Sequence, residues 1–119
     1  MSPEVLVVAA ICLGGAAGAL ARALAGRLIR SAFPLATLLV NVTGSFILAA
    51  AYTALPPGET VLRALLGAGF CGAFTTWSTF ILESFILIRA GQWYRALLYL
   101  ASTLILCCLA SGLAVYLIG

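Results

Sequence analysis

Four long apolar segments follow one another along the 119-residue chain and limit what it can fold into. They occupy residues 5–25, 33–55, 61–88 and 96–118, and the last contains no charged residue. A helix needs about 20 apolar residues to cross the ~30 Å hydrocarbon core of a bilayer, and each segment reaches that length. Each segment is also too long for a β-strand. We therefore predict an all-α membrane protein with four transmembrane helices.

The composition agrees with a chain that faces lipid. Hydrophobic residues make up 65% of it and charged residues 8%, against about 25% charge in a soluble domain. The six arginines and three acids stand in a few places between uncharged segments, so no basic patch favours nucleic-acid binding. The first segment follows Glu4 instead of basic residues, which argues against a removable signal peptide. We expect one four-span domain, residues 1–119, in the inner (plasma) membrane.

The connections between the segments are short. They lie at residues 26–32, 56–60 and 89–95, and the second contains the turn-forming sequence Pro-Pro-Gly. Helices joined this tightly run antiparallel to their neighbours, so both termini should lie on one side. Four helices enclose little space, and a pore forms more easily between two copies than inside one. The sequence therefore predicts a dimer.

The arginines are distributed unequally between the two sides of the membrane. The side that holds the first and third connections carries Arg22, Arg27, Arg30, Arg89 and Arg95. The other side carries only Arg63, which Glu59 partly offsets. Because arginine-rich connections stay in the cytoplasm, we expect both termini outside it.

Polar residues recur at every fourth position in two of the segments. The second segment has Thr37, Asn41 and Ser45, and the fourth has Tyr99, Thr103, Cys107 and Ser111. Residues four apart share a helix face, so each set forms a stripe, and two facing stripes would line a narrow polar path. Alternatively, such hydroxyls bond to their own helix or join helices, each bond contributing about 0.6 kcal/mol. The spacing alone leaves both interpretations open.

The third segment is a poor helix former at its centre. Residues 67–80 combine three glycines with β-branched, hydroxyl and aromatic residues. We predict a break near Gly72 to Thr76, where freed backbone carbonyls of Gly72 and Thr75 suit a small hard cation. The alternative is a continuous helix with a glycine packing groove.

Three motifs together resemble the small bacterial fluoride channels of the Fluc or CrcB family. Residues 14–22 are similar to the family's first-span glycine and arginine motif, residues 37–46 to its second-span signature, and residues 72–80 to its third-span threonine and aromatic motif. The four-span length and Tyr99 also agree. The resemblance implies an antiparallel, dual-topology dimer with two fluoride pores and a buried structural sodium ion on the two-fold axis. It further implies passive fluoride export that reduces fluoride toxicity.

The resemblance also implies roles for individual residues. In the fluoride pathway Asn41 would be the amide donor, and Trp77 and Phe80 would present positive ring edges to the anion. The hydroxyls of Ser78, Thr79, Tyr99 and Thr103 would extend this pathway. Backbone carbonyls of Gly72 and Thr75 from each subunit would bind the sodium ion, and Arg22 would concentrate anions near a pore entrance.

The chain departs from the family pattern at three positions. Trp77 stands where phenylalanine is usual, which adds an indole N–H donor and removes some room. Ala36 replaces the glycine that usually precedes Thr37, and Cys107 replaces a hydroxyl with a weaker donor. The arginine asymmetry also differs from a chain that inserts both ways. We favour a homodimer, with a heterodimer that includes an oppositely oriented paralogue as the alternative.

Other functions fit the sequence less well. A small multidrug-resistance-type drug/proton antiporter requires an acid in the middle of its first span, where this chain has none. A non-transporting membrane subunit would explain the glycines but not the polar stripes. Glu83 is the one acid within a span, either a proton carrier or a partner of an arginine or a backbone group. The chain has no histidine and no carboxylate pair, so we predict that it is not an enzyme.

Overall fold

The computed structural model describes all 119 residues and confirms the predicted four-helix membrane fold. Three of the long helices are continuous: α1 (Pro3–Leu28), α2 (Leu35–Ala54) and α6 (Trp93–Ile118). The third span, Thr60–Arg89, consists of α3 (Thr60–Ala64), a π-helical segment (Leu65–Cys71), α4 (Gly72–Phe74) and α5 (Trp77–Arg89). All four spans are long and apolar enough to cross a membrane.

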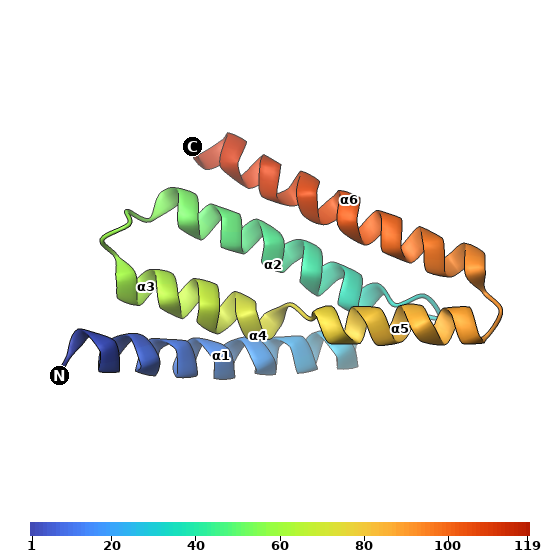
Figure 1. The fold of residues 1–119 in the computed structure, drawn as a ribbon, viewed down its shortest axis with the longest axis horizontal. Helices are drawn as coiled ribbons and strands as arrows, with labels where there is room; N and C mark the ends of the chain where they lie inside the picture. Colours follow the sequence, from blue (N-terminus) through green and yellow to red (C-terminus); the bar gives the residue numbers. More distant parts are fainter.

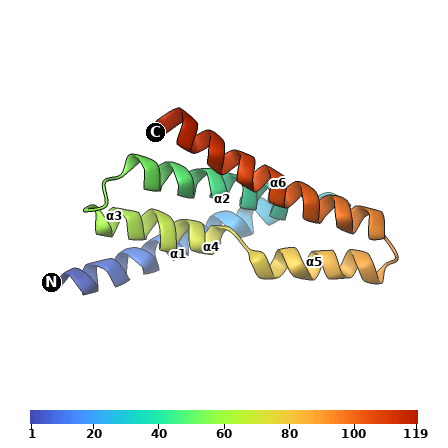
Figure 2. The ribbon, with the colours of Figure 1, turned by 45° about the horizontal axis from the view of Figure 1, so that its top comes forward.

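Successive spans run in opposite directions along the 54 Å long axis, and both termini lie at the same end, as expected (Figure 1). The helices form two packed pairs. One pair is α2 with α6, and the other is α1 with the π-helical segment and α4. Beyond α4 the third span leaves α1, and α5 packs against α6 instead (Figure 2). The third span therefore connects the two pairs.

Most side chains face outward. Only 19 of the 119 residues are buried, and many of the exposed ones are large and apolar. Apolar side chains favour contact with lipid over contact with water, so this surface identifies a multi-pass membrane protein. The largest buried side chains are Phe80 and Tyr99, in a small core where α2, α5 and α6 meet.

Glycines on α1 allow the third span to approach closely. A Cβ atom at Gly14 would overlap the carbonyl oxygen of Leu65, and one at Gly18 would overlap the carbonyl oxygen of Phe70. Two helices with such small residues at their contact can bring their backbones together. The spacing of Gly14 and Gly18 therefore serves helix packing.

The third span is interrupted twice. Residues Leu65–Cys71 form a π-helix, whose turn is wider than that of an α-helix. The chain then breaks at Thr75 and Thr76, which have extended backbone angles (φ −81°, ψ 156° and φ −148°, ψ 112°). The predicted break is confirmed, and the continuous helix is excluded. The π-helix was not predicted, because the glycines indicate weak helix propensity without fixing the hydrogen-bond pattern.

Candidate functional site

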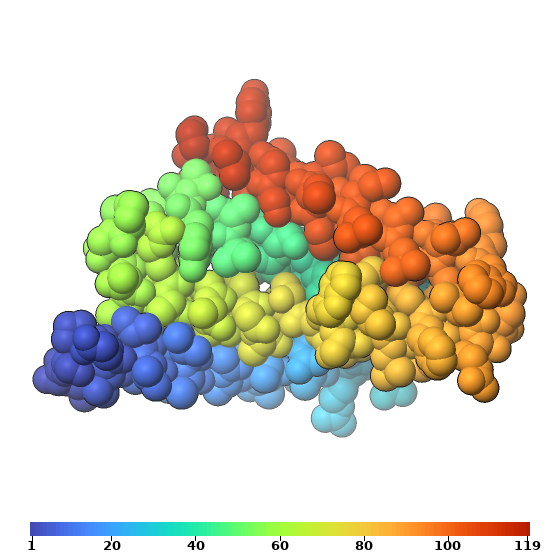
Figure 3. Space-filling model, in the orientation of Figure 1, coloured from blue at the N-terminus to red at the C-terminus, as the bar shows by residue number.

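A groove of about 760 Å³ lies between α2, α6 and the interrupted third span. In Figure 3 the surface is hollowed between α2 and the part of the chain from α4 to α5. The lining residues with a polar group in the side chain are Asn41, Ser45, Tyr52, Thr75, Thr76, Trp77, Thr103 and Ser111, together with Cys71 and Cys107. No charged residue lines the groove. The two predicted stripes therefore meet along most of their length, while Thr37 and Tyr99 lie outside the groove and are buried.

Asn41 and Thr76 fix the break in the third span. The side-chain oxygen of Asn41 accepts a hydrogen bond from the Thr76 N–H (2.8 Å), and its amide nitrogen donates to the Thr76 carbonyl (3.3 Å). Thr76 also caps α5, because its hydroxyl accepts from the Thr79 N–H (3.2 Å). The sequence prediction omitted Thr76, although a threonine before an apolar helix is a recognised N-cap signal.

The same bonds release two backbone carbonyls of the third span. In an unbroken helix the Thr76 N–H would bond to the Gly72 carbonyl and the Thr79 N–H to the Thr75 carbonyl. Here those two N–H groups donate to Asn41 and to the Thr76 hydroxyl instead. Both Gly72 and Thr75 line the groove. Neutral carbonyl oxygens without their helical donors are the ligand type that a hard monovalent cation requires, so these residues fit the sodium ion that the family resemblance implies.

Some of the polar side chains that line the groove donate to the backbone, and others keep a free hydrogen-bond donor. Ser45 donates to the carbonyl of Asn41 (2.8 Å), and Ser111 donates to the carbonyl of Ser45 (3.4 Å). By contrast, the Thr103 hydroxyl is buried and has no partner. Asn41 retains its second amide N–H, because a carboxamide carries two and only one is used. The lining side chains with an unpaired N–H or O–H donor are therefore Asn41, Tyr52, Thr76, Trp77 and Thr103.

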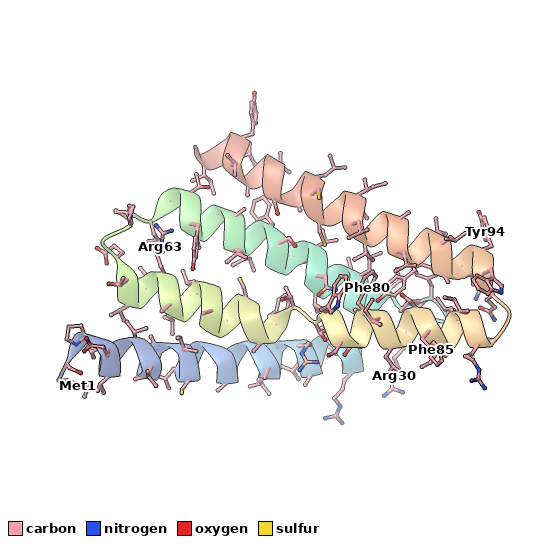
Figure 4. The ribbon with its side chains drawn as sticks, in the orientation of Figure 1. Met1, Arg30, Arg63, Phe80, Phe85 and Tyr94 are labelled. Atoms are coloured by element: carbon pink, nitrogen blue, oxygen red, sulfur yellow. The ribbon has the colours of Figure 1, made fainter.

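Three aromatic side chains contact one another in series at the groove, Trp77 with Phe80 and Phe80 with Tyr99. Phe80, near the start of α5, is 1% exposed (Figure 4). Its ring contacts Tyr99 of α6 edge-on at a centroid distance of 5.1 Å. Trp77 also packs against Phe80, at a centroid distance of 5.4 Å, and is 68% exposed. Phe80 is therefore held by two aromatic neighbours, and of the two aromatic residues that line the groove here Trp77 is the more exposed.

A second cavity of about 510 Å³ lies at the end of the molecule that contains the first connection. Arg22, Arg30, Thr79 and Glu83 line it, and Thr76 borders both this cavity and the groove. Arg30 and Arg63 lie toward opposite ends of the molecule in Figure 4, which follows the predicted separation of charge. The cavity is thus a positively charged neighbour of the uncharged groove.

Arg22 and Glu83 each have a specific partner near this cavity. The Arg22 Nε–H donates to the carbonyl of Ala73 (3.0 Å), which precedes the break. Glu83 accepts a hydrogen bond from the Tyr99 hydroxyl (3.0 Å) instead of pairing with an arginine or a backbone group. The Tyr99 hydroxyl is consequently already engaged. Ser78 is exposed and lines neither the groove nor the second cavity.

Comparison with known proteins identifies close relatives. Residues 9–115 match the family described as CrcB-like protein, Camphor Resistance (CrcB). The fluoride-specific ion channel FluC of Shewanella woodyi is 43% identical over 103 residues, which cover 82% of this chain and 83% of that protein. The FluC of Anaeromyxobacter dehalogenans is 45% identical over 111 residues, 87% of each chain. The FluC of Thermococcus onnurineus is 45% identical over 105 residues, 84% of this chain and 85% of that protein.

Proposed function

Because the chain belongs to the CrcB-like family, we propose that it is a fluoride-selective channel through which cytoplasmic fluoride leaves the cell passively. The observation that carries this proposal is the uncharged groove with unused hydrogen-bond donors at Asn41 and Thr103. The relatives of this chain that are named fluoride-specific ion channel support fluoride as the transported ion. Export of this kind reduces fluoride toxicity without a catalytic step.

The groove suits a small, strongly hydrated anion. Such an ion must receive hydrogen bonds wherever it loses water, and a full positive charge at the same place would trap it. Asn41 is held rigidly by its two bonds to Thr76, so its second N–H has a fixed position. Thr103 supplies a hydroxyl from α6 on the same groove. Fluoride would pass from donor to donor without meeting a charged side chain.

The second cavity would act as an entrance. Arg22 and Arg30 give it positive charge, which raises the local concentration of anions. Its shared border at Thr76 connects it to the groove. A negative-inside membrane potential drives an anion outward by about 2.3 kcal/mol per 100 mV, so the channel needs no other energy source.

The groove lies on the surface of one chain, and a second copy would complete a closed pathway. We favour an antiparallel homodimer with two pores. Reporter tags at the C-terminus test this arrangement in cells that lack any paralogue. Tags found on both sides of the membrane support the homodimer, whereas a single orientation would overturn it in favour of a heterodimer with an oppositely oriented paralogue.

A structural sodium ion would be held by the carbonyls of Gly72 and Thr75 from each subunit. The observation that supports this assignment is the loss of the helical donors of both carbonyls. A bound cation would neutralise the partial negative charge of these oxygens and join the two broken helices. Neither residue needs a particular side chain for this role, because the backbone supplies the ligands.

The rival functions lack a corresponding feature. A drug/proton antiporter of the small multidrug resistance type needs an acid within its first span, but the one acid of α1, Glu4, lies exposed in the first turn. A non-transporting subunit of a membrane complex would have no use for unpaired donors in a groove.

Fluoride efflux from liposomes that contain the purified protein alone tests the proposed function. A potassium gradient clamped by valinomycin drives the anion, and chloride serves as the comparison ion. Fast efflux of fluoride without chloride is the expected result. If neither ion leaves the liposomes, even after co-expression with an oppositely oriented paralogue, the proposal is contradicted.

A further inference from the structure

Trp77 carries an indole N–H that the fold leaves unused. It is the first residue of α5, directly after the break, and it lines the groove together with Asn41 and Phe80. Its indole N–H donates to no group of the chain. A donor without an acceptor is unfavourable at the depth of a bilayer, so the indole N–H requires a partner from outside the chain.

The backbone holds Trp77 in place beside Asn41. The residue before it, Thr76, has both its N–H and its carbonyl bonded to the Asn41 side chain (2.8 and 3.3 Å). On its other side the indole ring packs against Phe80, which is buried and itself held by Tyr99. Trp77 is therefore anchored through its backbone and through its ring, although 68% of its surface remains exposed.

Some other donors near this point are already in use. The hydroxyls of Ser45 and Ser111 donate to backbone carbonyls, and that of Tyr99 donates to Glu83. Apart from the indole, an anion in the groove would depend on the second N–H of Asn41 and on hydroxyls such as those of Thr76 and Thr103. An indole N–H is a stronger donor to an anion than the C–H edge of a phenyl ring, because its hydrogen carries more positive charge.

We propose that the indole N–H of Trp77 donates a hydrogen bond directly to the anion in the groove and that this residue sets the affinity and selectivity of the chain for fluoride. This inference rests on the proposed function and adds one donor to it. Fluoride concentrates its charge in a small radius and accepts stronger hydrogen bonds than chloride does. A fixed N–H donor therefore favours fluoride more than an aromatic edge at the same position would.

The chain offers a direct spectroscopic test, because it contains only two tryptophans, Trp77 and Trp93. Trp93 is the first residue of α6 and does not line the groove. In the Trp93→Phe variant, all tryptophan emission comes from Trp77. Titration of this purified variant with sodium fluoride should change the emission in a saturable way, and sodium chloride at equal ionic strength should not. Emission that fluoride leaves unchanged would overturn the inference.

Flux measurements with Trp77→Phe give the second test. Loss of one hydrogen bond to a charged acceptor should raise the half-saturating fluoride concentration about tenfold and reduce the preference over chloride. Trp93→Phe is the matched control and should behave as the unsubstituted chain does. Selective fluoride efflux with an unchanged half-saturating concentration in Trp77→Phe would overturn the role of the indole and leave the channel function standing. If neither the variants nor the unsubstituted chain conduct fluoride, the channel function is contradicted instead. The fluorescence titration then still reports whether fluoride binds at Trp77.

Discussion

Asn41 on α2 makes two hydrogen bonds to the backbone of Thr76, one through each end of its carboxamide. A polar side chain of one span thus replaces the helical partners that the broken third span has lost. The same bonds expose the carbonyl of Gly72 and fix the position of Trp77. Asn41 therefore has a structural role in addition to the donor role proposed for it.

Substitution at Asn41 should separate these two roles. Asn41→Ala leaves the N–H and carbonyl of Thr76 without partners and should lower the free energy of unfolding by about 1–3 kcal/mol. Asn41→Asp keeps an acceptor for the Thr76 N–H and should retain part of that stability. Its negative charge in the groove should nevertheless abolish fluoride efflux. Thermal unfolding in detergent and liposome efflux measure the two effects.

Ser45→Ala is the control for Asn41, since Ser45 lies one turn later and donates only to the carbonyl of Asn41. This variant should unfold and conduct nearly as the unsubstituted chain does. Efflux at the normal rate from Asn41→Asp would show that the anion does not pass Asn41.

The close approach of α1 to the third span predicts a contrast between two adjacent glycines. At Gly14 a methyl group would overlap the Leu65 carbonyl oxygen, whereas at Gly15 its nearest neighbour, the carbonyl oxygen of Gly69, is 3.9 Å away. Gly14→Ala should therefore lower the free energy of unfolding by about 1–3 kcal/mol, as overpacking does. Gly15→Ala should change it by less than about 1 kcal/mol. Unfolding in detergent measures both, and equal stability of the two variants would contradict the packing seen here.

The helices and the break were predictable from sequence because each depends on local physics. Long uncharged segments fix the four spans, and the glycines and hydroxyl residues of 67–80 weaken the third one at its centre. Which hydroxyls stay free was not predictable. That property depends on long-range pairs such as Tyr99 with Glu83, which are 16 residues apart on different helices. The bond of Arg22 to Ala73, across 51 residues, was equally inaccessible to sequence reasoning.

The bond between Tyr99 and Glu83 predicts how changes at Glu83 will behave. Glu83→Gln keeps an oxygen acceptor for the buried hydroxyl, so its free energy of unfolding should stay within about 1 kcal/mol of the original. Glu83→Ala leaves that hydroxyl unpaired and should cost about 1–3 kcal/mol. If Glu83 is structural, fluoride efflux persists in Glu83→Gln. Lost efflux in Glu83→Gln at unchanged stability would instead assign the carboxylate a direct part in transport.

Arg22 should show two separable effects, because its charge lines the second cavity while its Nε–H holds the Ala73 carbonyl. Arg22→Gln removes the charge and should slow fluoride efflux at about 0.01 M salt, where the Debye length is about 30 Å. Near 0.1 M salt the Debye length is about 10 Å, and the difference in efflux from the unsubstituted chain should shrink. Arg22→Lys keeps the charge but lacks the planar guanidinium, so it should preserve the salt dependence and lose about 1 kcal/mol of stability.

Arg30→Lys is the matched control for this pair of variants. Arg30 lines the same cavity, but its Nε–H donates only to the exposed carbonyl of Arg27 three residues earlier. Its replacement by lysine should therefore change neither stability nor efflux. A salt-independent loss of efflux in Arg22→Gln, matched by an equal loss in Arg22→Lys, would show that Arg22 acts only by holding the break. Attraction of anions at the entrance would then have to come from other charges.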